Sequence, residues 1–314
     1  MSRQPNFFFI GGMRCGSTTL NLMLEQHPNI FMSPIKEPNF YVPETLRRLA
    51  NPTTAEREKL AFLEQSGKYR TPGAYFELFE GSAEADYVGE SSHYLYHPKV
   101  AQTIRDDCPN AKILVCLRNP ADRLFSEYLL HLRRGEVRSD FASFVDEMAS
   151  GFIRGTTPDK SLIPRLNKGL QHQLILPWID MFGRDNVKLV LFENLELRPL
   201  DVAADIFDWL SIEDEFAPVV VHTQKGGRPK RKGLAQIFNT QGRTAAKVKK
   251  LIPDITKKKL RSWFYEKSLE RPMMDPKTKT FLMDFYRNDV LELQRLIDTD
   301  LEHWFEARTR KDAV

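Results

Sequence analysis

The sequence predicts an α/β protein in which helices flank a central, mainly parallel sheet. Three short apolar runs, each followed by a helical pattern, support this prediction: Asn6–Ile10, Lys112–Leu117 and Val187–Phe192. Apolar runs that do not alternate with polar residues are typical of parallel strands covered on both faces. Since strands that alternate with helices usually build one sheet, we expect a single domain over residues 5–308 and a disordered tail at 309–314.

The first unit has the pattern of a strand, a glycine-rich turn and a helix. Its strand ends at Gly11, and helical spacing of apolar residues begins at Ser17. The turn has the G-x-x-x-x-G spacing of a phosphate-binding loop, with Ser17 where nucleoside-triphosphate enzymes have lysine. Such a loop favours an anion because its N–H groups and the helix start both carry positive potential. A turn that only packs helix on strand is the alternative.

The second unit places polar side chains directly after a buried strand. Arg118 follows the run Lys112–Leu117, and Asn119 and Pro120 have the character of an N-cap and a first helical residue. Ligands of open α/β sheets bind beyond the carboxyl ends of the strands, where Arg118 would lie. Ser126 lies about two turns into the helix, and a guanidinium with a hydroxyl can bind phosphate. A salt-bridge role for Arg118 is the alternative.

The rest of the chain has weaker patterns. Val88–Glu90 is a candidate short strand, and a helical stripe follows the third strand and another follows Pro276. Residues 43–81 and 135–162 are more polar, which predicts insertions at the sheet edge rather than separate domains.

Composition narrows the possible classes of protein. The chain has 314 residues, 41% of them hydrophobic and 28% charged, which excludes a largely disordered protein. Its 3 cysteines have neither disulfide-framework nor zinc-site spacing, so we expect a reducing, cytoplasmic location and no metal. No apolar run of 18 residues or more occurs, so we expect no membrane span.

Positive charge is concentrated in one stretch, residues 225–261. It contains thirteen lysines and arginines and a single acid, Asp254, although the whole chain has a net charge of only +4. Such a stretch favours the binding of anions. It could be a loop that closes over a bound anion, a solvated basic face or a nucleic-acid-binding surface.

Four segments, taken in order, resemble the sulfotransferases that use 3′-phosphoadenosine-5′-phosphosulfate (PAPS), above all the bacterial and carbohydrate types such as heparan sulfate sulfotransferases. The segments are Gly11-Gly12-Met13-Arg14-Cys15-Gly16-Ser17-Thr18, His27-Pro28-Asn29-Ile30 with Lys36-Glu37-Pro38-Asn39-Phe40-Tyr41, Gly89-Glu90-Ser91-Ser92, and Arg118-Asn119-Pro120 through Arg123, Ser126 and Tyr128. The chain departs from the usual family pattern at Arg14, Asn39 and His93, where Lys, His and Pro are common.

The resemblance implies a P-loop-kinase-like sulfotransferase fold and a binding site for PAPS, with adenosine 3′,5′-bisphosphate as the product and no metal. The residues that it assigns to nucleotide binding are Arg14, Cys15, Gly16, Ser17, Thr18, Thr19, Arg118, Ser126 and a closing loop of Lys225, Gly226, Gly227 and Arg228.

For catalysis, the resemblance implies that Glu37 is the general base and that Arg14 stabilises the leaving oxygen. His93 is the rival base, and Glu90 is a further candidate with a structural or positioning role. The expected acceptor is a hydroxyl, or an amine, of a small molecule or oligosaccharide.

Two alternatives come from other classes of protein. A P-loop kinase dependent on a nucleoside triphosphate is disfavoured by Ser17 in the lysine position. A nucleic-acid-binding protein would use residues 225–261, but aromatic residues are sparse there, so we expect no nucleic-acid partner.

Overall fold

The computed structural model describes residues 4–66, 71–153, 163–212, 215–221, 228–229, 269–270 and 273–306. The chain divides into two compact units. The first comprises Met1–Pro120, Leu170–Thr223 and Tyr286–His303, and the second comprises Ala121–Gly169, Gln224–Phe285 and Trp304–Val314.

A five-stranded sheet forms the centre of the first unit. Its strands, in chain order, are β1 (Phe7–Phe9), β2 (Ile30–Met32), β3 (Tyr87–Ser91), β4 (Lys112–Leu117) and β5 (Val187–Leu191). They lie side by side in the order β2-β3-β1-β4-β5, and every pairing is parallel. The carboxyl ends of all five strands therefore meet at one edge of the sheet.

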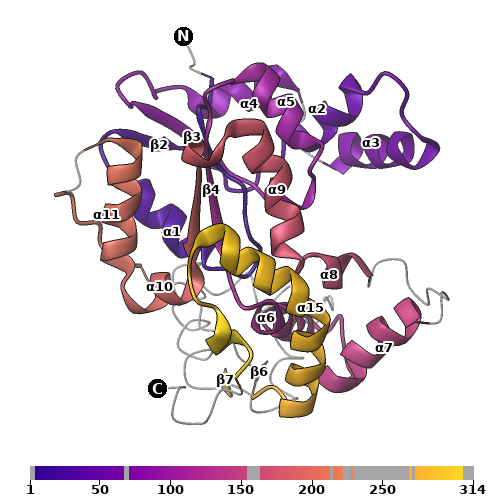
Figure 1. The fold of residues 1–314 in the computed structure, drawn as a ribbon. Helices are drawn as coiled ribbons and strands as arrows, with labels where there is room; N and C mark the ends of the chain where they lie inside the picture. Colours follow the sequence, from indigo (N-terminus) through magenta and orange to yellow (C-terminus); the bar gives the residue numbers. More distant parts are fainter. Residues whose placement is uncertain are drawn as a thin grey trace, which may run out of the picture. The chain divides into compact units, whose positions relative to one another are not determined.

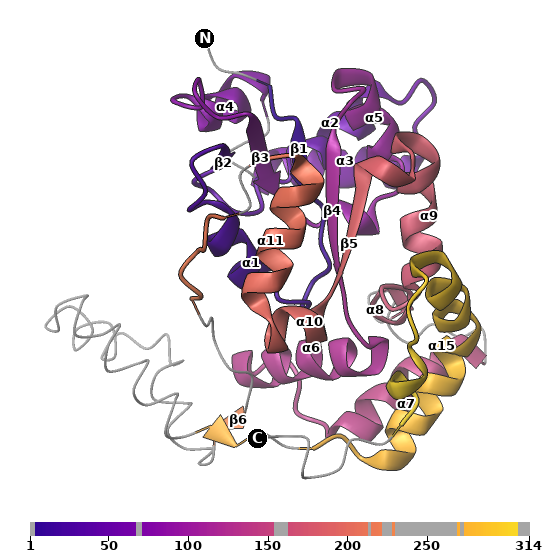
Figure 2. The same cartoon turned by 60° about the vertical axis from the view of Figure 1, so that its left-hand side comes forward.

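Helices cover both faces of this sheet. Figures 1 and 2 show α1 (Ser17–Leu24) and α11 (Pro199–Leu210) on one side, and α5 (Val100–Asp107) and α9 (Gln171–Phe182) on the other. This unit also contains α2 (Tyr41–Arg48), α3 (Thr54–Ser66), α4 (Pro72–Phe76), η1 (Glu77–Phe79), η2 (Tyr94–Tyr96), η3 (Arg184–Asn186), α10 (Phe192–Leu197) and η4 (Glu302–Trp304), whose last residue falls in the second unit.

Alternate residues of the central strands face opposite helical layers. One apolar cluster joins β1 and β4 to α1, α10 and α11, with members Phe7, Phe9, Leu20, Met23, Leu24, Leu114, Cys116, Leu195, Ile206 and Phe207. Phe8 points to the other side, where its ring packs edge-on against Tyr41 at 5.7 Å between centroids. Because both faces are covered, β1 and most of β4 consist of buried apolar residues, while β3 carries the buried polar residues Glu90 and Ser91.

The second unit contains α6 (Pro120–Arg134), α7 (Phe141–Ile153), α8 (Ile163–Asn167) and the strand pair β6 (Arg228–Pro229) and β7 (Leu269–Glu270). The first half of α15 (Pro276–Ile297) also belongs to it, and the second half belongs to the first unit. Aromatic rings of α6 and α7 pack together, with Tyr128 5.2 Å from Phe141. A buried ion pair joins Arg123 to Glu127 one turn along α6, at 2.8 Å.

The predicted fold class is confirmed: a parallel sheet is flanked by helices. The predicted strand Lys112–Leu117 agrees with β4, while β3 is longer than the expected Val88–Glu90. The sequence did not predict β2, which is held by pairing with β3 and has no local strand pattern. Over the described residues, every helix is too short or too polar to cross a bilayer.

Candidate active site

Four segments follow four adjacent strands, and each contains a predicted site residue or a direct neighbour of one. The glycine loop follows β1, Lys36 follows β2, His93 follows β3 and Arg118 follows β4. The parallel arrangement brings these residues, distant in sequence, to the same edge of the sheet. This edge is the candidate active site.

The glycine loop turns sharply into α1. Gly16 has φ +84°, and a Cβ there would lie 2.8 Å from Leu195 Cδ2 and 3.0 Å from Phe192 Cδ2. Glycine is therefore required at this position by both backbone conformation and space. Gly16 is also the N-cap of α1 and offers no side chain to the first N–H groups of the helix. A helix start without a side-chain cap is a favourable place for an anion.

The start of the loop is fastened to β4. The Gly12 N–H donates to the Cys116 carbonyl and the Cys116 N–H donates to the Gly11 carbonyl, both at 2.8 Å. The Met13 N–H donates to the Tyr96 hydroxyl at 2.9 Å. These bonds hold the backbone of the loop in place before any ligand binds.

Two buried thiols lie under the loop. The Cys116 thiol donates to the Cys15 carbonyl at 2.6 Å, and burial raises the pKa of Cys116. Cys15 is 1% exposed, its N–H donates to the Gly12 carbonyl at 3.3 Å and its carbonyl accepts from Cys116, so this predicted nucleotide-binding residue packs within the loop.

Lys36 reaches across from the segment after β2 to the start of α1. Its Nζ donates to Thr18 Oγ1 at 2.8 Å and to Ser17 Oγ at 3.2 Å. Burial lowers the pKa of Lys36, and the neighbouring Glu37 carboxylate acts in the opposite direction. An ammonium thus stands beside the residue that occupies the P-loop lysine position.

The two candidate bases, Glu37 and His93, face each other. Glu37 Oε1 lies 3.1 Å from His93 Nε2. The hydrogen bond from His93 lowers the pKa of Glu37, while partial burial raises it and the charges of His93 and Lys36 lower it further. The buried His93 Nδ1 has no hydrogen-bond partner among the described residues.

The backbone of the Glu37 segment is fastened to the end of β3. Glu37 has φ +61°, and its N–H donates to the Ser91 carbonyl at 2.8 Å. The Asn39 N–H donates to Ser92 Oγ at 3.1 Å, and the Asn39 amide donates to the Glu37 carbonyl at 2.7 Å. Asn39 thus stabilises the turn that presents Glu37.

Glu90, the further candidate base, is fully buried under this segment. It accepts hydrogen bonds from Tyr75 at 2.8 Å, Tyr94 at 2.6 Å and Ser92 at 2.5 Å. Burial raises the pKa of Glu90, and the three hydroxyl donors oppose that rise. A carboxyl group with 0% exposure and three internal partners has a structural environment.

The Arg118 side chain contacts the glycine loop. Its guanidinium donates to the Arg14 carbonyl at 2.8 Å and lies 4.2 Å from the centroid of the Phe192 ring. The buried Gln171 side chain fixes its backbone, accepting from the Arg118 N–H at 3.1 Å and donating to the Arg118 carbonyl at 2.8 Å. Asp289 in turn accepts from the His172 N–H at 3.0 Å.

The other predicted ligands lie on different elements. Ser17, Thr18 and Thr19 form the first turn of α1. Ser126 lies half-buried on α6, in the second unit. The closing loop of Lys225, Gly226, Gly227 and Arg228 lies outside the described residues, except for the backbone of Arg228 in β6, and so does most of the basic stretch 225–261.

Sequence reasoning missed three residues of this site: Lys36, Gln171 and Phe192. Lys36 stands next to Glu37 in the Lys36-Glu37-Pro38 segment, which was the available signal. Gln171 and Phe192 have no local signal, because each reaches Arg118 only through the packing of α9 and α10.

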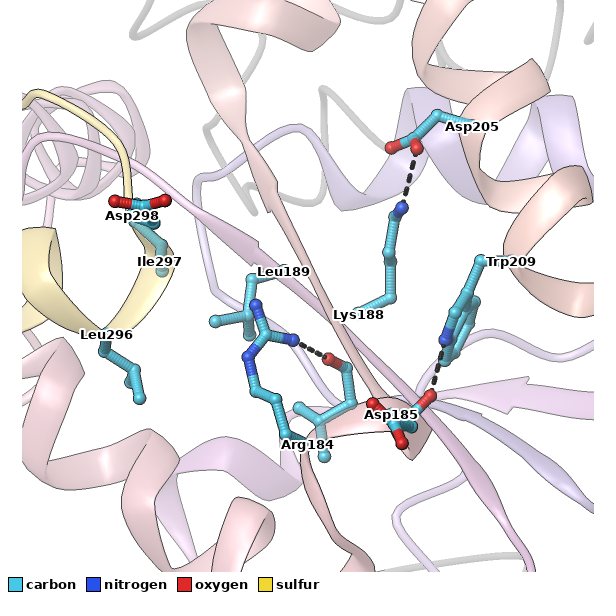
Figure 3. Close-up of a pocket in the computed structure, with 10 residues that line it drawn as sticks. Arg184, Asp185, Lys188, Leu189, Asp205, Trp209, Leu296, Ile297 and Asp298 are labelled. Atoms are coloured by element: carbon cyan, nitrogen blue, oxygen red, sulfur yellow. Dashed lines mark hydrogen bonds and ion pairs between the residues drawn. The ribbon is translucent and has the colours of Figure 1, made fainter.

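A separate pocket of about 570 Å³ lies beside β5 (Figure 3). Arg184, Lys188, Trp209 and Asp298 are among its lining residues, and none of the lining residues belongs to the glycine loop. Several of its polar groups have internal partners: Lys188 pairs with Asp205 at 2.7 Å, and the Trp209 indole donates to the Asp185 carbonyl at 2.8 Å. Within the described ranges, no group of three or more His, Cys, Asp or Glu could hold a metal ion.

Comparison with known proteins gives one consistent result. The model of the sulfotransferase family matches residues 5–216. A solved sulfotransferase from Alicyclobacillus acidocaldarius is 27% identical, with a TM-score of 0.67 over 97% of this chain and 100% of that one.

Curated relatives carry related names. Carbohydrate sulfotransferase 15 of Mus musculus is 23% identical over 66% of this chain and 44% of its own length. Bifunctional heparan sulfate N-deacetylase/N-sulfotransferase 3 of Homo sapiens is 24% identical over 94% of this chain and 30% of its own length. The chain therefore spans less than half the length of these relatives.

Proposed function

The chain belongs to the sulfotransferase family, and from that premise we propose that it transfers the sulfuryl group of PAPS to a hydroxyl group of a saccharide. The donor supplies an activated sulfur whose leaving group is the 5′-phosphate of adenosine 3′,5′-bisphosphate. The protein must hold two phosphates, orient the acceptor and accept one proton.

The observation that carries this proposal is the meeting of two anion-binding elements. The uncapped start of α1 suits the 5′-phosphosulfate, and the Arg118 guanidinium, 2.8 Å from the Arg14 carbonyl, suits a second phosphate. An anion site for each end of a nucleoside bisphosphate fits PAPS better than a linear triphosphate. Ser126 is the proposed second ligand of the 3′-phosphate.

Glu37 is the proposed general base. Its side chain is 42% exposed and can meet an acceptor, while the His93 hydrogen bond orients it. The acceptor hydroxyl gives its proton to this carboxylate as its oxygen attacks sulfur. Arg14 and the N–H groups of the loop stabilise the charge that develops on the departing oxygen. His93 is the rival base, with Glu37 orienting it.

A saccharide acceptor is supported by the names of the relatives, which are carbohydrate and heparan sulfate enzymes. The basic stretch 225–261 would suit an acidic saccharide. An amine acceptor is the second candidate, because one relative is named an N-sulfotransferase. A cytoplasmic location stays a prediction from the cysteine content.

Two measurements test the proposal. Calorimetry should show that adenosine 3′,5′-bisphosphate binds more tightly than ATP with Mg²⁺. Label from [³⁵S]PAPS should pass to at least one member of a panel containing heparan sulfate, its N-desulfated form, chondroitin and simple phenols. Transfer to a phenol alone would contradict the proposal that the acceptor is a saccharide. Phosphate transfer from ATP without binding of the bisphosphate would overturn the whole proposal.

A further inference from the structure

We propose that Lys36 supplies a second cation, beside Arg14, that binds the leaving 5′-phosphate oxygen where the P-loop lysine is absent. This inference rests on the proposed function. It assigns a role in the transfer to a residue that comes from the segment after β2 rather than from the loop itself.

The position of the ammonium carries the inference. Lys36 Nζ lies 2.8 Å from Thr18 Oγ1 and 3.2 Å from Ser17 Oγ, so it is fixed at the first turn of α1. Ser17 stands where the phosphate-binding lysine of the G-x-x-x-x-G-K-[ST] pattern would be. The ammonium that is absent from position 17 of the loop is thus supplied in space by Lys36, in addition to the guanidinium of Arg14.

The chemistry explains why an ammonium would be kept there. An ammonium beside the positive end of a helix, at a half-buried site, is poorly placed for stability, because the helix start favours negative charge. Partial burial, which lowers the pKa of Lys36, is a further cost of this position. A bound phosphate oxygen would offset both costs, since it accepts from the ammonium and from the helix N–H groups together.

Lys36 would take part in the transfer through its charge alone. A bond forms between the acceptor oxygen and sulfur, and the bond between sulfur and the 5′-phosphate oxygen breaks. The electron pair of that bond stays on the phosphate oxygen, and the acceptor proton passes to Glu37. Lys36 holds its charge at the departing oxygen and keeps its own proton, so its contact strengthens as the transfer proceeds.

Three ligands isolate the contact: adenosine 3′,5′-bisphosphate, adenosine 3′-monophosphate and adenosine 5′-monophosphate. Lys36→Met should lower the affinity for both ligands that carry the 5′-phosphate by about tenfold to a hundredfold. Affinity for the 3′-monophosphate should be unchanged. Lys188→Met is the matched control, because Lys188 is also a partly buried lysine, 21% exposed, and lies in the separate pocket beside β5.

A second measurement needs no variant. Acetylation of Lys36 in the wild-type protein, followed by mass spectrometry, should slow by about tenfold with saturating bisphosphate, because a bound phosphate covers the amine. Acetylation of Lys188 should not change. Equal labelling of Lys36 with and without bisphosphate would overturn the inference.

These results separate the two proposals. If the wild-type protein binds the bisphosphate and transfers sulfate, while Lys36→Met weakens all three ligands equally or none, the role of Lys36 is wrong and the proposed function stands. If the wild-type protein does not bind the bisphosphate at all, the proposed function fails and takes the role of Lys36 with it.

Discussion

Glu37 and His93, 56 residues apart, meet at 3.1 Å between Oε1 and Nε2. The contact forms because the Glu37 N–H is hydrogen-bonded to the Ser91 carbonyl at the end of β3, two residues before His93. The two candidate bases therefore form one pair, in which one side chain takes the proton and the other orients the side chain that takes it. Which group accepts the proton from the acceptor follows from comparing their variants.

Glu37→Gln should lower turnover by about a hundredfold or more, because the amide keeps the size of the side chain but cannot act as a base. Affinity for adenosine 3′,5′-bisphosphate should change little. His93→Ala should lower turnover less, since Glu37 keeps its carboxylate. The measurement is turnover with [³⁵S]PAPS at saturation, beside calorimetry with the bisphosphate.

Glu136→Gln is a matched control, because Glu136 also pairs with a histidine, His131, but in the second unit and outside the candidate site. Abolished turnover in His93→Ala with near wild-type turnover in Glu37→Gln would make His93 the base.

The pH profile should depend on His93. The hydrogen bond from His93 is the largest cause that lowers the pKa of Glu37, so this carboxylate stays ionised to more acidic pH. Activity that needs the ionised carboxylate is lost as the pH falls through that lowered pKa. Removing the bond in His93→Ala raises the pKa, so the loss should begin at higher pH. Turnover measured from neutral to acidic pH checks the shift, and an unmoved acidic limb would exclude the pairing as its cause.

Arg118→Ala should weaken the binding of adenosine 3′,5′-bisphosphate by roughly 2 to 4 kcal/mol, because it removes a charge-assisted contact to the 3′-phosphate. The binding of adenosine 5′-monophosphate should weaken far less.

Gln171→Leu should weaken the binding of the bisphosphate by about 1 kcal/mol, because it frees the Arg118 backbone without removing the guanidinium.

Gln26 provides the control for Gln171. Its side chain binds both the N–H and the carbonyl of Val219, at 2.9 and 3.1 Å, as Gln171 binds those of Arg118. Gln26→Leu should leave nucleotide affinity unchanged in calorimetry. Equal weakening of both nucleotides by Arg118→Ala would mean that Arg118 supports the loop rather than the 3′-phosphate.

Gly16→Ala should lower the free energy of unfolding by roughly 1 to 3 kcal/mol, because a Cβ would add a 2.8 Å contact with Leu195 to the strain of a positive φ. Gly81 separates the two causes, since it has φ +89° and a Cβ added there would meet nothing within 4 Å. Gly81→Ala should therefore cost only about 1 kcal/mol, the strain of the backbone by itself. Urea unfolding of both variants gives the comparison, and equal costs would show that Leu195 and Phe192 give way.

Local patterns were sufficient for the framework of this site. The apolar runs at β1 and β4, the glycine loop and Arg118 show in the residue types of short continuous segments, although distant contacts hold them in place. The short strand β2 was missed because it has no such local pattern: its three residues are held by pairing with β3, and pairing partners are invisible in a single sequence.

Local residue patterns predict the fold class, a loop that suits an anion and the absence of lysine from that loop. The contact of Lys36 with Ser17, the bonds from Gln171 to Arg118 and the pairing of Glu37 with His93 appear only in the folded chain. They form because the parallel sheet carries segments far apart in the chain to one edge. Distances between side chains there depend on strand order and register, and these are set by the packing of the whole unit rather than by any local pattern.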